Sequence, residues 1–203
     1  MLNLLPAESS LGLKEWAVAV NALIQGEQIL ILRKGGIHKD DKEFRVVHPE
    51  FLLFPTYEHQ KAELVKEAYH PDLQKTEIEN DVDGLITLSC FAIVTDMFET
   101  SDPDALTRIS DYHIWTDDYA EKRLHWRPKQ PLTVALLRIY KLTQPQALPI
   151  LDEFAGCKSW VDLRQVVPMG QINPVLSDAD YEKQAGAIRN ALVGVATSVK
   201  VGA

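Results

Sequence analysis

Three short polar segments carry the side chains with which this chain could do chemistry. The first is Thr56-Tyr57-Glu58-His59-Gln60, whose phenol, carboxylate and imidazole groups are typical of general acid–base catalysis. We expect it at the end of a strand, with Thr56 capping a helix that begins at Tyr57. The dipole of that helix would keep His59 neutral and able to act as a base. Tyr57, Glu58 and His59 are therefore the candidate catalytic residues; in the structural alternative, Thr56 caps, Tyr57 packs and Glu58 complements the dipole.

The second segment, Arg33-Lys34-Gly35-Gly36, places two cations at a predicted turn. Glycines let backbone N–H groups approach an anion closely, so all four residues are ligand-binding candidates. The segment lacks the glycine spacing of the two common phosphate-binding loops. The alternative is a structural β-turn with exposed cations.

The third segment contains Arg123, His125, Trp126 and Arg127, at the start of a basic stretch over residues 122–141. An aromatic ring between cations can stack on a base while the cations contact phosphates, so these four are also ligand-binding candidates. An acidic stretch precedes them and would restrict what enters such a groove. The alternatives are two solvated faces of opposite charge and a Trp126 that anchors the end of a strand.

Composition limits the class of protein. The 203 residues are 46% hydrophobic and 25% charged, and the net charge of −8 opposes a general nucleic-acid coat. Histidines are scattered without the spacing of a metal site, so we expect no bound metal. Cys90 and Cys157 form no close pair and predict buried free thiols of a cytoplasmic protein. No apolar run reaches the roughly 18 residues of a membrane helix, and the N-terminus lacks the basic region of a signal peptide.

Helical and strand patterns alternate irregularly, without repeats or linkers. They predict one mixed α/β (α+β) domain over residues 1–203, with a central mixed sheet or open barrel flanked by helices. Apolar spacing predicts helices over 13–24, 58–69, 103–123 (interrupted), 146–156 and 177–193. A capping box at Ser177–Asp180 opens the last helix, and a frayed tail follows it. β-Branched and aromatic runs predict strands over 28–33, 44–47, 51–54, 85–94, 132–142 and 160–168.

Together, the turn Arg33–Ile37, the run FLLFPTYEHQ (51–60) and the strand LLRIY (136–140) resemble domain of unknown function 1802, a bacterial family. The resemblance covers about residues 11–168 and implies a fold, because the family has no assigned activity. The predicted opening, a helix followed by Gly26 and a strand ending in Arg33, is also similar to PUA-like and ASCH domains. These are small β-barrels associated with RNA or modified bases.

The order helix, three strands, helix, strand is similar to the core of the PD-(D/E)XK nucleases. That family holds magnesium with an acid on one strand and an E-x-K on the next. The third strand here reads Glu50-Phe51-Leu52-Leu53 and lacks the lysine, so Lys34 or Lys61 would have to replace it.

Three functions remain open from the sequence. We expect a nucleic-acid or nucleotide-binding domain that uses a basic site near strand ends, where residues 33–34 and 57–59 should converge. The first alternative is a metal-dependent phosphodiester hydrolase, which alone would require magnesium. The second is a scaffold or dimerisation protein that uses the aromatic region 112–126.

Overall fold

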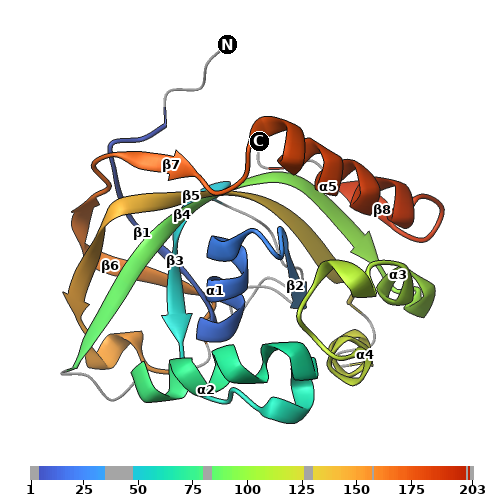
Figure 1. Cartoon of the computed structure of the whole chain (residues 1–203), viewed down its shortest axis with the longest axis horizontal. Helices are drawn as coiled ribbons and strands as arrows, with labels where there is room; N and C mark the ends of the chain where they lie inside the picture. The colour runs from blue at the N-terminus through green and yellow to red at the C-terminus, as the bar shows by residue number, and fades with distance from the viewer. Residues whose placement is uncertain are drawn as a thin grey trace.

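A mixed β-sheet forms the body of the protein, and helices flank it (Figure 1). The computed structural model describes residues 5–34, 48–79, 84–125, 130–156, 158–199 and 201. The strands are β1 (Glu8–Trp16), β2 (Leu30–Lys34), β3 (Glu50–Thr56), β4 (Leu85–Thr100), β5 (Leu132–Pro149), β6 (Trp160–Pro168), β7 (Ile172–Pro174) and β8 (Thr197–Val199). The helices are α1 (Ala17–Gln25), α2 (His70–Glu79), α3 (Pro103–Arg108), α4 (Asp117–His125) and α5 (Asp178–Leu192). Four 3-10 turns are η1 (Ala62–Leu64), η2 (Glu67–Tyr69), η3 (Ser110–Tyr112) and η4 (Asp152–Phe154). The predicted fold class is confirmed.

The order of the strands in the sheet is β2-β5-β4-β3-β1-β6, with β7 on β5 and β8 on β4. The long β4/β5 hairpin runs antiparallel from the pair Leu85↔Pro149 to the pair Thr100↔Leu132. The other edge of β4 is shared: β3 pairs with residues 91–93 and β8 with residues 97–99. The last short strand therefore covers the part of the β4 edge that β3 leaves open.

Helix α1 lies inside the curve of the sheet, between β3 and β2 (Figure 1). Its buried side chains are Ala17, Val18, Ala19, Val20, Ala22 and Leu23. Side chains alternate between the faces of β3, so Phe51 and Leu53 pack with this helix, while Leu52 and Phe54 join an apolar cluster on the opposite face. Both faces of β3 are therefore buried.

The predicted helix over 13–24 begins too early, because residues 8–16 form β1. This strand pairs in parallel with β3 and antiparallel with β6, and these backbone hydrogen bonds outweigh the local helical spacing. The helical part ends as predicted at Gly26, whose φ of 76° is left-handed. A Cβ at Gly26 would also lie 2.7 Å from Leu176 Cδ2, so a larger residue would have to displace that side chain as well as adopt the left-handed φ.

The helix predicted over 58–69 is wrong. Residues 64–66 instead pair with residues 114–116: Lys66 N–H donates to the Ile114 carbonyl (2.8 Å), and Thr116 N–H to the Leu64 carbonyl (3.1 Å). The His70-Pro71 dipeptide, just after the predicted helix, stands at the start of α2. Proline suits the first turn of a helix because the missing N–H has no intrahelical partner there.

Two further expectations are corrected near the C-terminus. Residues 146–149 continue β5 rather than forming a helix, because they pair with the first residues of β4. Residues 197–199, expected to be frayed, form β8. The predicted start of the last helix is confirmed, since Ser177 is the N-cap of α5 and its Oγ accepts the Asp180 N–H at 3.1 Å. The predicted strand 44–47 lies outside the described residues.

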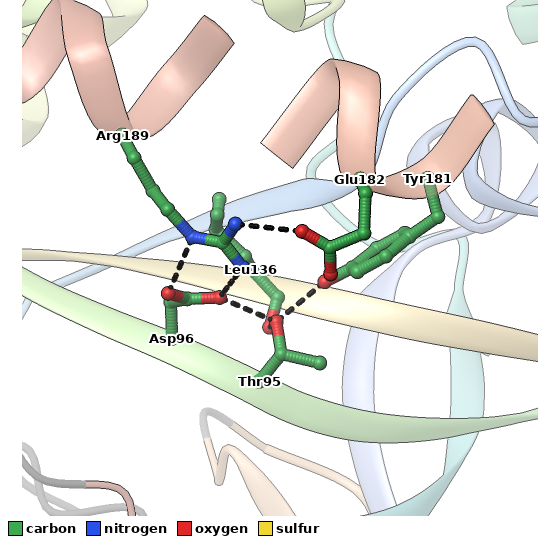
Figure 2. Close-up of polar contacts among 6 residues, drawn as sticks. All are labelled: Thr95, Asp96, Leu136, Tyr181, Glu182 and Arg189. Atoms are coloured by element: carbon green, nitrogen blue, oxygen red, sulfur yellow. Dashed lines mark hydrogen bonds and ion pairs between the residues drawn. The ribbon is translucent and has the colours of Figure 1, made fainter. Parts of the chain in front are cut away.

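A cluster of hydrogen bonds and ion pairs links helix α5 to β4, as Figure 2 shows. Arg189 donates to both carboxylate oxygens of Asp96, at 2.8 and 2.9 Å, and to Glu182 at 2.9 Å. Thr95 Oγ1 donates to Asp96 at 2.8 Å and also contacts the hydroxyl of Tyr181. The Arg189 hydrogen bond lowers the pKa of Asp96, so the carboxylate stays ionised.

Arg189→Ala should lower the free energy of unfolding by roughly 1–2 kcal/mol, because a charge-assisted pair is lost at a partly exposed site. The folded-state pKa of Asp96 is depressed, so its stabilisation is present above its unfolded pKa and disappears as the pH falls through the folded value. Urea denaturation at pH 7 and near pH 3 measures both effects. Lys183→Ala, an exposed change on the same helix, is the control. Equal losses of stability in the two variants would show that the Arg189–Asp96 contact does not stabilise the packing of α5.

Candidate functional site

A buried ion pair joins two strands that are distant in the sheet order. Arg33 on β2 and Glu15 on β1 are separated by β5, β4 and β3, yet Arg33 Nη2 lies 3.0 Å from Glu15 Oε2. The same nitrogen donates to the Lys14 carbonyl oxygen. The sheet is therefore curved enough for the Arg33 side chain of β2 to reach β1. Arg33 Nε is buried and has no hydrogen-bond partner among the described residues.

Glu15 connects this ion pair to the start of α1. Its Oε1 accepts the Trp16 N–H at 2.9 Å, and its backbone carbonyl accepts the Thr56 hydroxyl at 3.2 Å. Trp16 occupies the N-cap position of α1 and offers no side-chain cap. The side chain of Gln60 supplies one instead, since its Oε1 accepts the Val18 N–H at 3.1 Å. Thr56 is thus the last residue of β3 rather than a helix cap.

Beside this ion pair lies what we name the aromatic–arginine cluster: Trp16, Trp115, Tyr119 and Arg123. The rings of Trp115 and Tyr119 stack with centroids 4.4 Å apart, and Trp16 meets Trp115 edge-on at 5.1 Å. The Arg123 guanidinium carbon lies 5.1 Å from the centre of the Tyr119 ring. Trp115 is buried, whereas Trp16 and Arg123 are half-buried and reach the surface.

Tyr119, in the aromatic–arginine cluster, lies within the electrostatic influence of the Arg33–Glu15 ion pair. Burial raises the pKa of the Tyr119 phenol, and the charges of Arg123, Glu15 and Arg33 act on the same group. The hydroxyl of Tyr119 therefore stays protonated at neutral pH and can donate a hydrogen bond. Tyr119 and Arg123 are four residues apart on α4, the spacing at which helical side chains meet.

Lys34, from the predicted segment Arg33–Gly36, contacts the C-terminal end of helix α4. Its ammonium donates to the Leu124 carbonyl oxygen in the last turn of α4, and burial lowers its pKa. A cation at this end of a helix satisfies a carbonyl that has no intrahelical partner. The exposed or half-buried basic residues of the same turn are Lys122, Arg123 and His125. The structure thus brings the segments of Arg33-Lys34 and Arg123–His125 together.

Four ligand-binding candidates, Gly35, Gly36, Trp126 and Arg127, lie outside the described residues. The sequence did not indicate the contribution of three described residues, Trp16, Glu15 and Gln60. Trp16 lay within the helix predicted over 13–24. The i, i+4 spacing of Tyr119 and Arg123 was the signal that could have identified the cluster.

The catalytic candidates lie elsewhere. Tyr57 and Glu58 border a cavity of about 290 Å³ with Lys14, whose side chain alternates with that of Glu15 along β1. His59 is an exposed turn residue with a left-handed φ of 65°. No helix begins at Tyr57, so the helix dipole expected to act on His59 is absent. Strands β2 and β3, near whose ends the residues expected to converge lie, are not neighbours in the sheet, since β5 and β4 separate them.

The described part of the chain contains no group of three or more His, Cys, Asp or Glu side chains arranged to hold a metal ion. Of the helices described, none combines the length and apolar character needed to cross a membrane.

The fold and the site define a mixed α/β domain whose curved sheet encloses a helix and carries an aromatic and basic surface at one edge. The family model described as domain of unknown function (DUF1802) matches residues 12–187, and the chain belongs to this family. Among solved structures, it is similar to a crystal structure of a mutant ZmASCH protein from Zymomonas mobilis. The identity is 13% and the TM-score 0.42, over 90% of this chain and 98% of that one. No curated protein matches the chain.

Proposed function

We propose that this protein binds a nucleotide or a short single-stranded nucleic acid at the aromatic–arginine cluster. The observation that supports this most is the placement of the Arg123 guanidinium over the Tyr119 ring, which stacks on Trp115 beside the half-buried Trp16. Indole and guanidinium faces stack on bases, and Arg contributes a cation–π attraction. Lys122 and His125 extend the basic surface for phosphate contacts.

The roles of the residues differ within this proposal. Trp16 and Arg123 reach the surface and would contact the ligand, whereas Trp115 is buried and supports the Tyr119 ring. The Arg33–Glu15 ion pair would act as a positioning device, because Glu15 accepts the backbone N–H of Trp16. The net charge of −8 opposes a long footprint on nucleic acid, so the ligand should be short.

Quenching of tryptophan fluorescence by a mixed-sequence single-stranded oligonucleotide and by mononucleotides tests the proposal. In Arg123→Ala, oligonucleotide affinity should fall because a stacking face is lost. The slope of log affinity against log salt should also lessen by about one, since one positive charge of the binding surface is lost with it. Lys183→Ala on α5 removes an equal charge away from the cluster and should change neither quantity. No binding at low salt, or equal binding by both variants and the native protein, would refute the proposal.

The same titration in the presence of magnesium separates binding from hydrolysis. Intact oligonucleotide recovered after incubation agrees with a binding domain. Magnesium-dependent cleavage that Arg123→Ala leaves unchanged would point to a hydrolase and away from the proposed role of the cluster.

A further inference from the structure

We propose that the cavity bordered by Tyr57 and Glu58 is a second ligand site, which takes a small organic amine with an apolar body. This site is separate from the aromatic–arginine cluster and does not depend on the proposed nucleic-acid function. Its volume of about 290 Å³ suits one small molecule.

The base of the cavity is apolar and well supported. Phe54 and Phe154 meet edge-on with centroids 5.6 Å apart, and both are buried, as is Ile86. These three side chains belong to the cluster that packs one face of the sheet, so the cavity has a fixed floor. Such a floor favours a ligand with an aromatic or branched aliphatic body.

The rim exposes large apolar side chains that a ligand could cover. Ile150 and Leu151 follow β5 and are 51% and 38% exposed. They lie where the β4/β5 hairpin ends, since Ile150 N–H donates to the Gly84 carbonyl at 2.9 Å. Adjacent exposed apolar residues at the mouth of a cavity are typical of a binding surface rather than of scattered surface residues.

The charges at the rim determine whether a cationic or an anionic ligand is favoured. Glu58 and Asp152 line the cavity, both are exposed, and in the described part of the chain neither carboxylate has a hydrogen bond or ion pair. The one cation in the lining, Lys14, donates to the backbone carbonyls of Phe154 and Gly156. Two carboxylates against one ammonium leave a net negative rim, which attracts a monocation and repels an anion.

Three probes with the same phenyl body test the proposal by ligand-observed NMR titration: 2-phenylethylammonium, 2-phenylethanol and phenylacetate. The ammonium should bind roughly tenfold more tightly than the carboxylate, because two exposed carboxylates each add a modest attraction. The double variant E58Q/D152N should abolish this preference, whereas E67Q/E77Q, which removes two exposed carboxylates elsewhere, should keep it. Ala155→Trp, at an exposed position in the cavity lining, should block all three probes.

Binding of phenylacetate as tight as that of the ammonium would overturn the proposal, as would a preference that survives E58Q/D152N. Absence of saturable ammonium binding would also overturn it. Arg123→Ala should bind 2-phenylethylammonium as the native protein does, so failure of the nucleic-acid proposal leaves this one intact.

Discussion

Replacing either Arg33 or Glu15 alone should lower the free energy of unfolding by about 3–5 kcal/mol, the largest effect expected of any single polar change here. Both side chains are at least nine-tenths buried, and their charged atoms lie 3.0 Å apart. In Arg33→Met or Glu15→Leu, one charge stays buried without its partner, and the desolvation of that charge is no longer offset. Urea denaturation followed by circular dichroism measures the loss.

The double variant E15L/R33M should recover much of this stability, because two apolar side chains replace the pair and leave no buried charge. Recovery should be incomplete, since the Trp16 N–H still lacks its acceptor. Glu63→Ala is the contrasting control: it breaks the exposed contact with Lys61 and should cost less than about 1 kcal/mol. If the losses in Arg33→Met and Glu15→Leu simply added in the double variant, the two residues would not act as a pair.

Acidification should destabilise the protein through His113, by up to about 3 kcal/mol between pH 6.5 and pH 4. Burial, aided by the nearby charge of Lys66, lowers the pKa of His113 from 6.5 to about 4. The folded state therefore favours the neutral imidazole. Its contribution is fully present above the unfolded pKa of 6.5, decreases as the pH falls below that value, and levels off near pH 4. Denaturation midpoints across this range measure the effect.

Two variants separate His113 from other titrating groups. His113→Leu should flatten the stability profile between pH 6.5 and pH 4, although its stability at pH 7 can change through packing. His125→Gln, at an exposed position on α4, should keep the native slope. Asp96 does not interfere, because its lowered pKa places its effect at more acidic pH. An unchanged slope in His113→Leu would show that another group controls the acid response.

Most strands could be predicted because their signal is local. The apolar runs at 51–54, 85–94, 132–142 and 160–168 lie in strands, and the run at 28–33 overlaps β2, which begins at Leu30. Their β-branched and aromatic composition suits a buried pleated surface. The start of α5 was equally local, since Ser177 caps a backbone N–H only three residues away. The family resemblance depended on the same local segments.

The errors share one physical cause, which is pairing with distant residues. Residues 13–16 have helical spacing but lie in a strand between β3 and β6, and residues 64–66 are held extended by residues 114–116. Hydrogen bonds to such partners outweigh a propensity difference of less than about 1 kcal/mol per residue.

In the candidate site, too, residue types could be read from the sequence, whereas contacts between distant residues could not. Residue types alone identified Arg33, Lys34 and Arg123 as candidate ligand-binding cations, and they placed Tyr57 and Glu58 just after a buried strand. They did not indicate that Arg33 would be neutralised by Glu15, or that Lys34 would bind the end of α4. Those contacts join residues 18 and 90 positions apart. The first exists because the curved sheet lets the Arg33 side chain of β2 reach β1, and the second because α4 packs beside β2. Both depend on how the strands and helices pair and pack together rather than on any one segment.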